Sequence, residues 1–104
     1  MAKVGPGGKI DVQATGQHGV PATGVSAVVV NVTATEGTAG SFLTVFPTGT
    51  TKPVASNLNF GPNENIPNLV VVKLGTGGKF SIYNDQGFTH VVADVEGWYG
   101  TSGN

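Results

Sequence analysis

The stretch VSAVVVNVTAT, residues 25–35, is the most apolar segment of the chain and sets its fold class. Side chains alternate between the two faces of a β-strand, so Val28 and Val30 share one face while Ala27 and Val29 share the other. Apolar residues on both faces predict a central strand. No segment has apolar residues at helical three-and-four spacing over even three turns, so the sequence predicts no helix.

Comparable patterns recur along the chain, separated by turns rich in Gly, Pro, Asn and Thr. The segment KIDVQAT (9–15) alternates strictly between apolar and polar residues, which is typical of a half-buried strand. The remaining predicted strands cover residues 41–47, 56–60, 69–75, 79–84 and 89–100. About seven short strands predict an all-β fold, an antiparallel β-sandwich that is Ig-like or jelly-roll-like. A closed barrel is the alternative.

Length and composition limit what the protein can be. The 104 residues suffice for a single domain, residues 1–104, and we expect flexible ends at 1–8 and 101–104. Charged residues make up 11% of the chain and the net charge is −1, which argues against binding to nucleic acid or to an anionic membrane surface. The longest strictly apolar run, residues 27–30, is far too short to span a membrane.

The ionisable residues indicate neither a metal nor a cofactor. The chain has no cysteine, which excludes disulfides and thiolate metal sites, and its two histidines lack the spacing of a zinc site. Ser81, His90 and Asp94 could be assembled into a hydrolytic triad, but no nucleophile-elbow motif surrounds the serine. We therefore expect no enzyme activity, no metal and no cofactor.

Five of the fourteen residues in ASNLNFGPNENIPN (55–68) are asparagine. Two interpretations are open. Their oxygens could bind a calcium ion or a sugar, although calcium usually takes several carboxylates and the stretch has only one. Alternatively, the amides hold the loop together, because asparagine tolerates left-handed backbone and bonds neighbouring backbone groups in turns. We favour loop building, and keep as candidate ligand-binding residues Asn57, Asn59, Asn63 and Asn65.

Aromatic residues are the other candidates for a binding surface. Trp98 and Tyr99 lie near the C-terminus in EGWYG, and Tyr83 lies in the predicted strand 79–84. Exposed aromatic rings can stack on sugars, but an aromatic residue in a terminal strand more often closes one end of the core. A sugar site also needs aromatic and amide groups that converge in one concavity, which the sequence alone does not predict.

Four segments together resemble a known domain: GVPATGVSAVVVNVTAT, GSFLTVFPTGTTKPVASNLNF, IPNLVVVKLGTGGKFSIYN and HVVADVEGWY. The resemblance covers residues 4–99 and is to an accessory β-domain, without assigned function, of large secreted and cell-surface proteins of actinobacteria such as streptomycetes. It implies an extracellular or cell-surface location. Members of that family usually carry a further upstream segment with an Arg-apolar-apolar-Asp-Thr-Arg motif, whereas this chain begins with MAKVGPGG.

These observations lead to two expectations about function. The first is a non-catalytic accessory module that binds carbohydrate or cell wall, or mediates adhesion. The second is a structural β-domain that forms a homo-oligomer through exposed sheet edges, because an open edge can pair with another chain. The absent upstream segment makes such an open edge more plausible, since a missing strand would leave its neighbour unpaired. No nucleic acid partner and no membrane insertion are expected.

Overall fold

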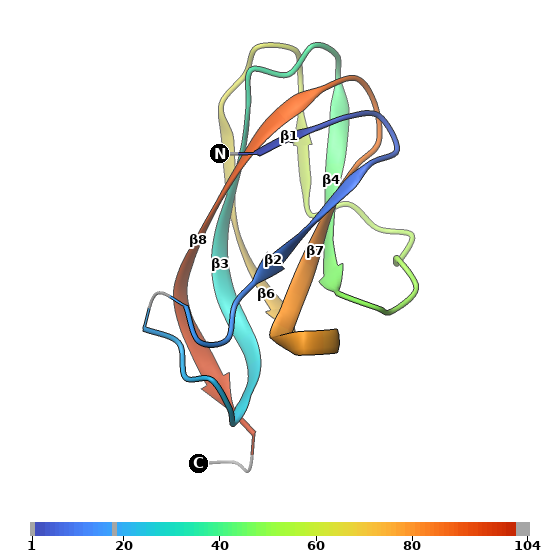
Figure 1. Ribbon diagram of the computed structural model, residues 1–104. Helices are drawn as coiled ribbons and strands as arrows, with labels where there is room; N and C mark the ends of the chain where they lie inside the picture. The colour runs from blue at the N-terminus through green and yellow to red at the C-terminus, as the bar shows by residue number, and fades with distance from the viewer. Residues whose placement is uncertain (1, 18, 102–104) are drawn as a thin grey trace.

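The computed structural model describes residues 2–17 and 19–101, which form two four-stranded antiparallel sheets packed face to face (Figure 1). Sheet A has the strand order β1-β8-β3-β6 and sheet B the order β2-β7-β4-β5. The strands are β1 (Ala2–Val4), β2 (Lys9–Gln13), β3 (Val25–Thr35), β4 (Ser41–Pro47), β5 (Leu58–Phe60), β6 (Ile66–Lys73), β7 (Lys79–Asn84) and β8 (Thr89–Gly100). One short 3-10 turn, η1 (Thr76–Gly78), precedes β7.

The strand order identifies the topology. Every connection between consecutive strands crosses from one sheet to the other, except the β4–β5 loop, which stays within sheet B. The order 1-8-3-6 facing 2-7-4-5 is that of the jelly roll, in which eight antiparallel strands form two Greek keys. The predicted all-β antiparallel sandwich is therefore confirmed, and of the two expected types the strand order is the jelly-roll one.

The predicted number of strands and the predicted flexible N-terminal end need correction. The structure has eight strands rather than about seven, because Ala2–Val4 forms β1 and pairs with β8. Residues 2–4 are thus part of sheet A rather than of a flexible end, and Val4 is only 2% exposed. At the other end, residues 102–104 of the expected flexible segment lie outside the described residues.

Strand β6 begins at Ile66, three residues before the predicted start at position 69. Pro67 made the preceding residues resemble a loop, because proline cannot donate a backbone hydrogen bond to a sheet. In the structure β6 is an edge strand of sheet A, where one side of the strand has no partner strand. An edge position accommodates proline when the missing N–H would face away from the sheet.

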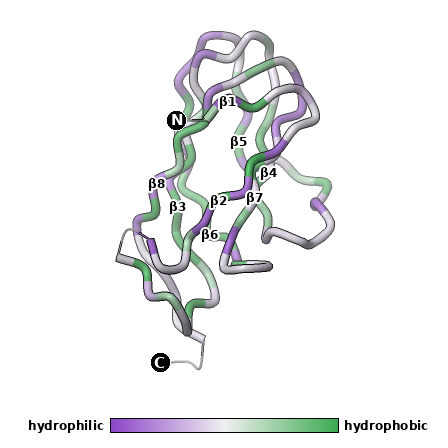
Figure 2. The backbone as a smooth tube through the Cα atoms, viewed as in Figure 1, coloured by the Kyte–Doolittle hydropathy of each residue, from purple (hydrophilic) through white to green (hydrophobic). Residues whose placement is uncertain are grey.

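The core lies between the two sheets. Sheet A contributes Val28, Val30 and Val32 from β3, all fully buried, and sheet B contributes Phe80 and Ile82 from β7. The β3 residues predicted to share one face do share it and point into this core. Figure 2 shows stretches of hydrophobic residues along β3 and β8, the two central strands of sheet A.

Candidate ligand-binding site

The β4–β5 loop, residues 48–57, covers part of the outer face of sheet B. In Figure 1 this loop stands out to the right of β4 and β7. Two hydroxyl contacts hold it against the sheet: Thr44 Oγ1 donates to the carbonyl oxygen of Ala55 at 2.6 Å, and the hydroxyls of Thr48 and Ser81 lie 2.8 Å apart. Thr44 and Ser81 are therefore fully buried although they belong to the outer face of the sheet.

Where the loop bends back, it forms a pocket of about 260 Å³ lined by Phe42, Lys52, Val54, Ala55 and Ser56. Ligand pockets commonly measure about 300–1,000 Å³, so this one matches a group the size of one ring rather than a long polymer segment. Its lining combines one aromatic ring and two aliphatic residues with two polar side chains. Mostly apolar walls with a few polar groups are typical of small-molecule sites.

Two of the pocket-lining residues, Phe42 and Lys52, contact Tyr83 of β7, which lies beside the pocket. The ring centroids of Phe42 and Tyr83 are 6.3 Å apart at an interplanar angle of 50°. The Lys52 ammonium lies 4.5 Å from the centroid of the Tyr83 ring, which is cation–π geometry. The Tyr83 hydroxyl donates a hydrogen bond of 3.0 Å to Asp85, and this bond raises the pKa of Tyr83 above its usual value.

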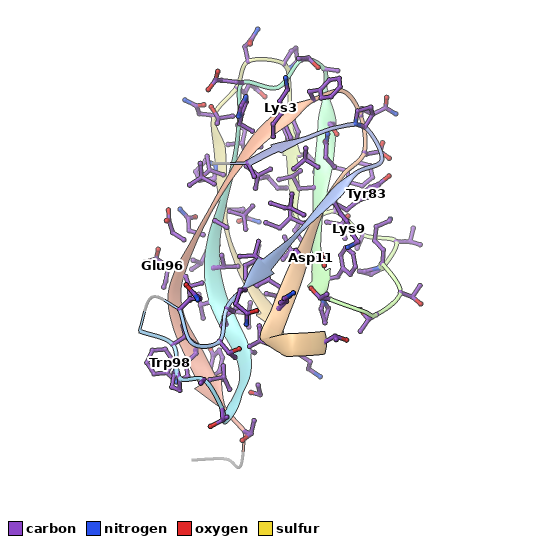
Figure 3. The ribbon with its side chains drawn as sticks, viewed as in Figure 1. Lys3, Lys9, Asp11, Tyr83, Glu96 and Trp98 are labelled. Carbon is purple, nitrogen blue, oxygen red and sulfur yellow. The ribbon has the colours of Figure 1, made fainter. Side chains whose placement is uncertain are left out.

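A charged pair lies beside Tyr83 on the neighbouring edge strand β2 (Figure 3). Lys9 Nζ is 2.7 Å from Asp11 Oδ1, and Ser81 Oγ donates to the same carboxylate at 2.7 Å. The Lys9 hydrogen bond and then the Ser81 hydrogen bond lower the pKa of Asp11. The side chains of Lys9 and Asp11 are 50% and 37% exposed, so this pair stays in contact with water.

Two of the predicted site residues belong to the same face as this pocket. Asn59 on β5 pairs directly with Phe42 on β4, so their side chains lie side by side on the outer face of sheet B. Tyr83 is on the same face, against Phe42. The structure therefore brings together Tyr83, Asn59 and the pocket aromatic residue Phe42.

Asn57 has a structural role. Strand β5 begins at Leu58, opposite Leu43, so β4 has no partner strand on this side beyond Leu43. Asn57 Oδ1 accepts a hydrogen bond of 2.7 Å from the backbone N–H of Val45, and the Asn57 N–H donates to the carbonyl oxygen of Leu43 at 2.8 Å. The asparagine side chain thus continues the backbone ladder beyond the end of the strand. Its amide oxygen is occupied and is not presented to a ligand.

Replacing Asn57 with alanine should lower the free energy of unfolding by about 1–2 kcal/mol, because the Val45 N–H loses its acceptor in a partly buried position. Equilibrium unfolding in urea measures this change. The matched control is Asn59→Ala, since Asn59 is exposed and its replacement should change stability by no more than about 0.5 kcal/mol. Equal effects of the two substitutions would contradict the assigned role of Asn57.

Asn63 and Asn65 lie in the β5–β6 connection, away from the pocket. Asn63 has a φ of 58°, a left-handed conformation that asparagine tolerates, and its N–H donates to the carbonyl oxygen of Gly37 at 2.9 Å. Asn65 accepts a hydrogen bond from the Thr35 hydroxyl. Both residues contribute to the loop structure, in agreement with the favoured interpretation of the asparagine-rich stretch.

Trp98 and Tyr99 lie at the far end of β8 in sheet A, so they do not join the pocket of sheet B; Figure 3 shows Trp98 and Tyr83 far apart. Trp98 pairs with Val28 and Tyr99 with Ala27, so the two rings point to opposite faces of the sheet. They are 48% and 55% exposed. They do not form a joint platform.

The residues of the hypothetical triad are also separated. Ser81 is on β7 in sheet B, where its hydroxyl bonds Asp11 and Thr48, whereas His90 and Asp94 are on β8 in sheet A. Within residues 2–17 and 19–101, no group of three or more His, Asp or Glu side chains is placed to hold a metal ion.

The sequence interpretation missed all five residues that line the pocket, Phe42 and Lys52 among them. Phe42 lies in a strand with an otherwise buried pattern, and Lys52 lies in a Thr-, Gly- and Pro-rich connection that looks like an ordinary loop. The only signal was the length of that connection, since a loop of ten residues within one sheet is longer than a hairpin requires.

The topology and this pocket define the class of the protein: an eight-stranded jelly-roll sandwich with a small apolar pocket on the outer face of one sheet. No family model matches the chain, and no curated protein or solved structure matches it significantly. Across the described residues, no helix is long and apolar enough to cross a membrane.

Proposed function

We propose that this protein is a non-catalytic binding module that takes a saccharide in the pocket between Phe42 and the β4–β5 loop. The observation that supports this most directly is the convergence of an aromatic ring with polar groups around one small cavity. The apolar face of a sugar ring packs on an aromatic side chain, while its hydroxyls need hydrogen-bond partners. Phe42 supplies the aromatic face, and Ser56 and Lys52 supply polar groups from the pocket lining. Asn59 lies next to Phe42 on the same face of sheet B.

The proposed setting is extracellular or at the cell surface. Its support is the resemblance of residues 4–99 to the accessory domain of actinobacterial surface proteins. The low content of charged residues, 11%, and the net charge of −1 fit a surface that contacts polysaccharide better than one that contacts nucleic acid. The jelly roll also occurs in lectin domains, but a fold hosts many functions, so the pocket carries the proposal.

Co-sedimentation with insoluble polysaccharides tests the proposal. The purified protein is spun with peptidoglycan, chitin, cellulose and xylan, and the bound fraction is measured. We expect retention on at least one polymer, reduced at least tenfold in affinity by Phe42→Ala. The matched control is Phe88→Ala, because Phe88 is also partly exposed, at 47%, but lies outside the pocket.

Three outcomes would contradict the proposal. If no polymer retains the protein, the proposal of saccharide binding fails. Retention that Phe42→Ala leaves unchanged places the site elsewhere. Retention lost in a Trp98→Ala, Tyr99→Ala variant but kept in Phe42→Ala would place it at the end of sheet A instead.

A second candidate function is self-assembly through the free edge of β6, and backbone geometry favours this edge. The Leu74 N–H donates to the carbonyl oxygen of Ser26 at 3.0 Å, and hydrogen-bonded pairs alternate with non-bonded pairs along an antiparallel ladder. The backbone groups of Leu69 and Val71 therefore face away from β3. Their side chains are 60% and 59% exposed, which gives an apolar open edge.

Light scattering after size-exclusion chromatography tests this second function. If β6 pairs with a second copy, the protein forms a discrete oligomer, and Val71→Lys shifts it toward monomer because it places a charge on the edge. Val54→Lys is the control, since Val54 is fully exposed in the β4–β5 loop, off the edge. A monomer at high concentration, or equal responses to both substitutions, would rule out assembly through β6.

A further inference from the structure

The pocket holds a lysine whose charge has no carboxylate partner in the described parts of the chain. The one ion pair in those residues is Lys9–Asp11, at 2.7 Å. The carboxylate of Asp85 accepts a hydrogen bond from the Tyr83 hydroxyl. Lys52 itself is half-buried, with its ammonium 4.5 Å from the Tyr83 ring centroid.

An aromatic face attracts an ammonium group but cannot accept its hydrogen bonds as a carboxylate does. The contact with Tyr83 therefore fixes the position of the Lys52 charge without neutralising it. Because Lys52 also lines the pocket, a ligand bound there meets this charge at a defined place. We infer that the pocket selects a saccharide that carries a carboxylate. This inference rests on the proposed saccharide function and specifies the class of its ligand.

The arrangement of the pocket suits such a ligand. A carboxylate near Lys52 can accept a charge-assisted hydrogen bond from the ammonium, and the Ser56 hydroxyl offers a second donor. The ring that carries the carboxylate can then pack against Phe42 and Val54. A neutral sugar would satisfy the apolar contacts but would leave the ammonium without an anionic partner.

The distribution of charge supports the same conclusion. The outer face of sheet B and its loop carry three lysines and two aspartates, a local net charge of +1: Lys9, Lys52, Lys79, Asp11 and Asp85. The other two lysines and four carboxylates of the chain then sum to −2, which gives the overall charge of −1. A weakly cationic face on an otherwise anionic protein favours the approach of an anionic ligand.

Two matched ligand pairs test the inference by isothermal titration calorimetry. The first pair is N-acetylmuramic acid and N-acetylglucosamine, which differ only by the lactyl ether that bears the carboxylate. The second pair is trigalacturonate and its carboxyl-reduced form. The two pairs separate a lactyl carboxylate from a uronate as the source of the charge. We expect the acidic member of at least one pair to bind at least tenfold more tightly, and salt to weaken that preference.

The protein variants are Lys52→Gln and, as a control, Lys3→Gln. Lys3 is a close match because its ammonium also lies over an aromatic ring, that of Phe88 at 5.1 Å, but on sheet A. Lys52→Gln should abolish the preference for the acidic member while weak binding of the neutral sugar persists. Lys3→Gln should leave the preference for the acidic member and the binding of the neutral sugar unchanged.

The outcomes distinguish this inference from the proposed function. Equal affinity for acidic and neutral members overturns the inference but leaves saccharide binding in place. Preference that survives Lys52→Gln also overturns it, because the carboxylate is then recognised elsewhere. Binding of none of the four sugars, together with no retention on the insoluble polymers, overturns both.

Discussion

Replacing Phe80 with alanine should lower the free energy of unfolding by about 3–5 kcal/mol, the range for removing a large aromatic side chain from a well-packed core. Phe80 is on the central strand β7 of sheet B, pairs with Val12 and Pro47, and is completely buried between the two sheets. A domain of this size is usually stable by about 5–15 kcal/mol, so the variant loses a large share of its stability. Unfolding in guanidinium chloride, followed by Trp98 fluorescence, measures the difference.

The control is Phe88→Ala. This removes the same side chain from a position that is 47% exposed, where the Lys3 ammonium lies over the ring. We expect a loss of about 1 kcal/mol or less, since much of the ring is already in water. Equal losses at the two positions would mean that the space between the sheets is not the stabilising core.

Replacing Asn84 with leucine should cost about 2–4 kcal/mol even though the two side chains have the same number of heavy atoms and branch at the same carbon. The Asn84 amide is fully buried, and its nitrogen donates to the carbonyl oxygens of Gly87, Val4 and Gly5 at 2.8, 3.2 and 3.3 Å. Its oxygen accepts from the Ser41 hydroxyl at 2.8 Å. Leucine leaves these groups without partners, and each buried unsatisfied group costs about 1–3 kcal/mol.

The Asn84 contacts also connect the strand β1 to sheet B, so the effect has a local signature. Relative to the unchanged protein, Asn84→Leu should accelerate deuterium exchange more at the backbone amides of β1 than at those of β3. The control Asn59→Leu changes an exposed amide and should alter stability by about 0.5 kcal/mol or less. If Asn84→Leu is as stable as the unchanged protein, the amide cluster does not hold β1 in place.

Much of the fold follows from local patterns in the sequence. The bounds of β3, β4, β7 and β8 agree with the predicted segments because each is rich in strand-favouring residues and is bounded by turn residues. Strand β3 is followed by Glu36 and Gly37, and β4, β7 and β8 end at Pro47, Asn84 and Gly100. Strand β1 was missed, since three residues are too few to show a period. The strand order could not be predicted either. The pairing of β1 with β8 joins residues almost ninety positions apart, and no local sequence pattern encodes that contact.

The site was less predictable than the fold. The structural role of Asn57 and Asn63 agrees with the turn chemistry of asparagine, which is a local property. The pocket depends instead on the β4–β5 loop folding back on sheet B, a tertiary contact fixed by hydroxyls such as that of Thr44. The buried role of Asn84 was not predicted for a related reason. An asparagine at a strand end looks like a turn residue until its buried partners are known.

The most direct test of the central claim, that the pocket under the β4–β5 loop binds a saccharide, is an NMR titration of ¹⁵N-labelled protein with N-acetylmuramic acid and trigalacturonate. The account predicts that amide shifts concentrate at Phe42, Lys52 and Ser56, with smaller changes at Tyr83 and none at Trp98. Shifts that concentrate at Trp98 and Tyr99 would contradict it. The absence of shifts with either sugar, together with no retention on the insoluble polymers, would also contradict it.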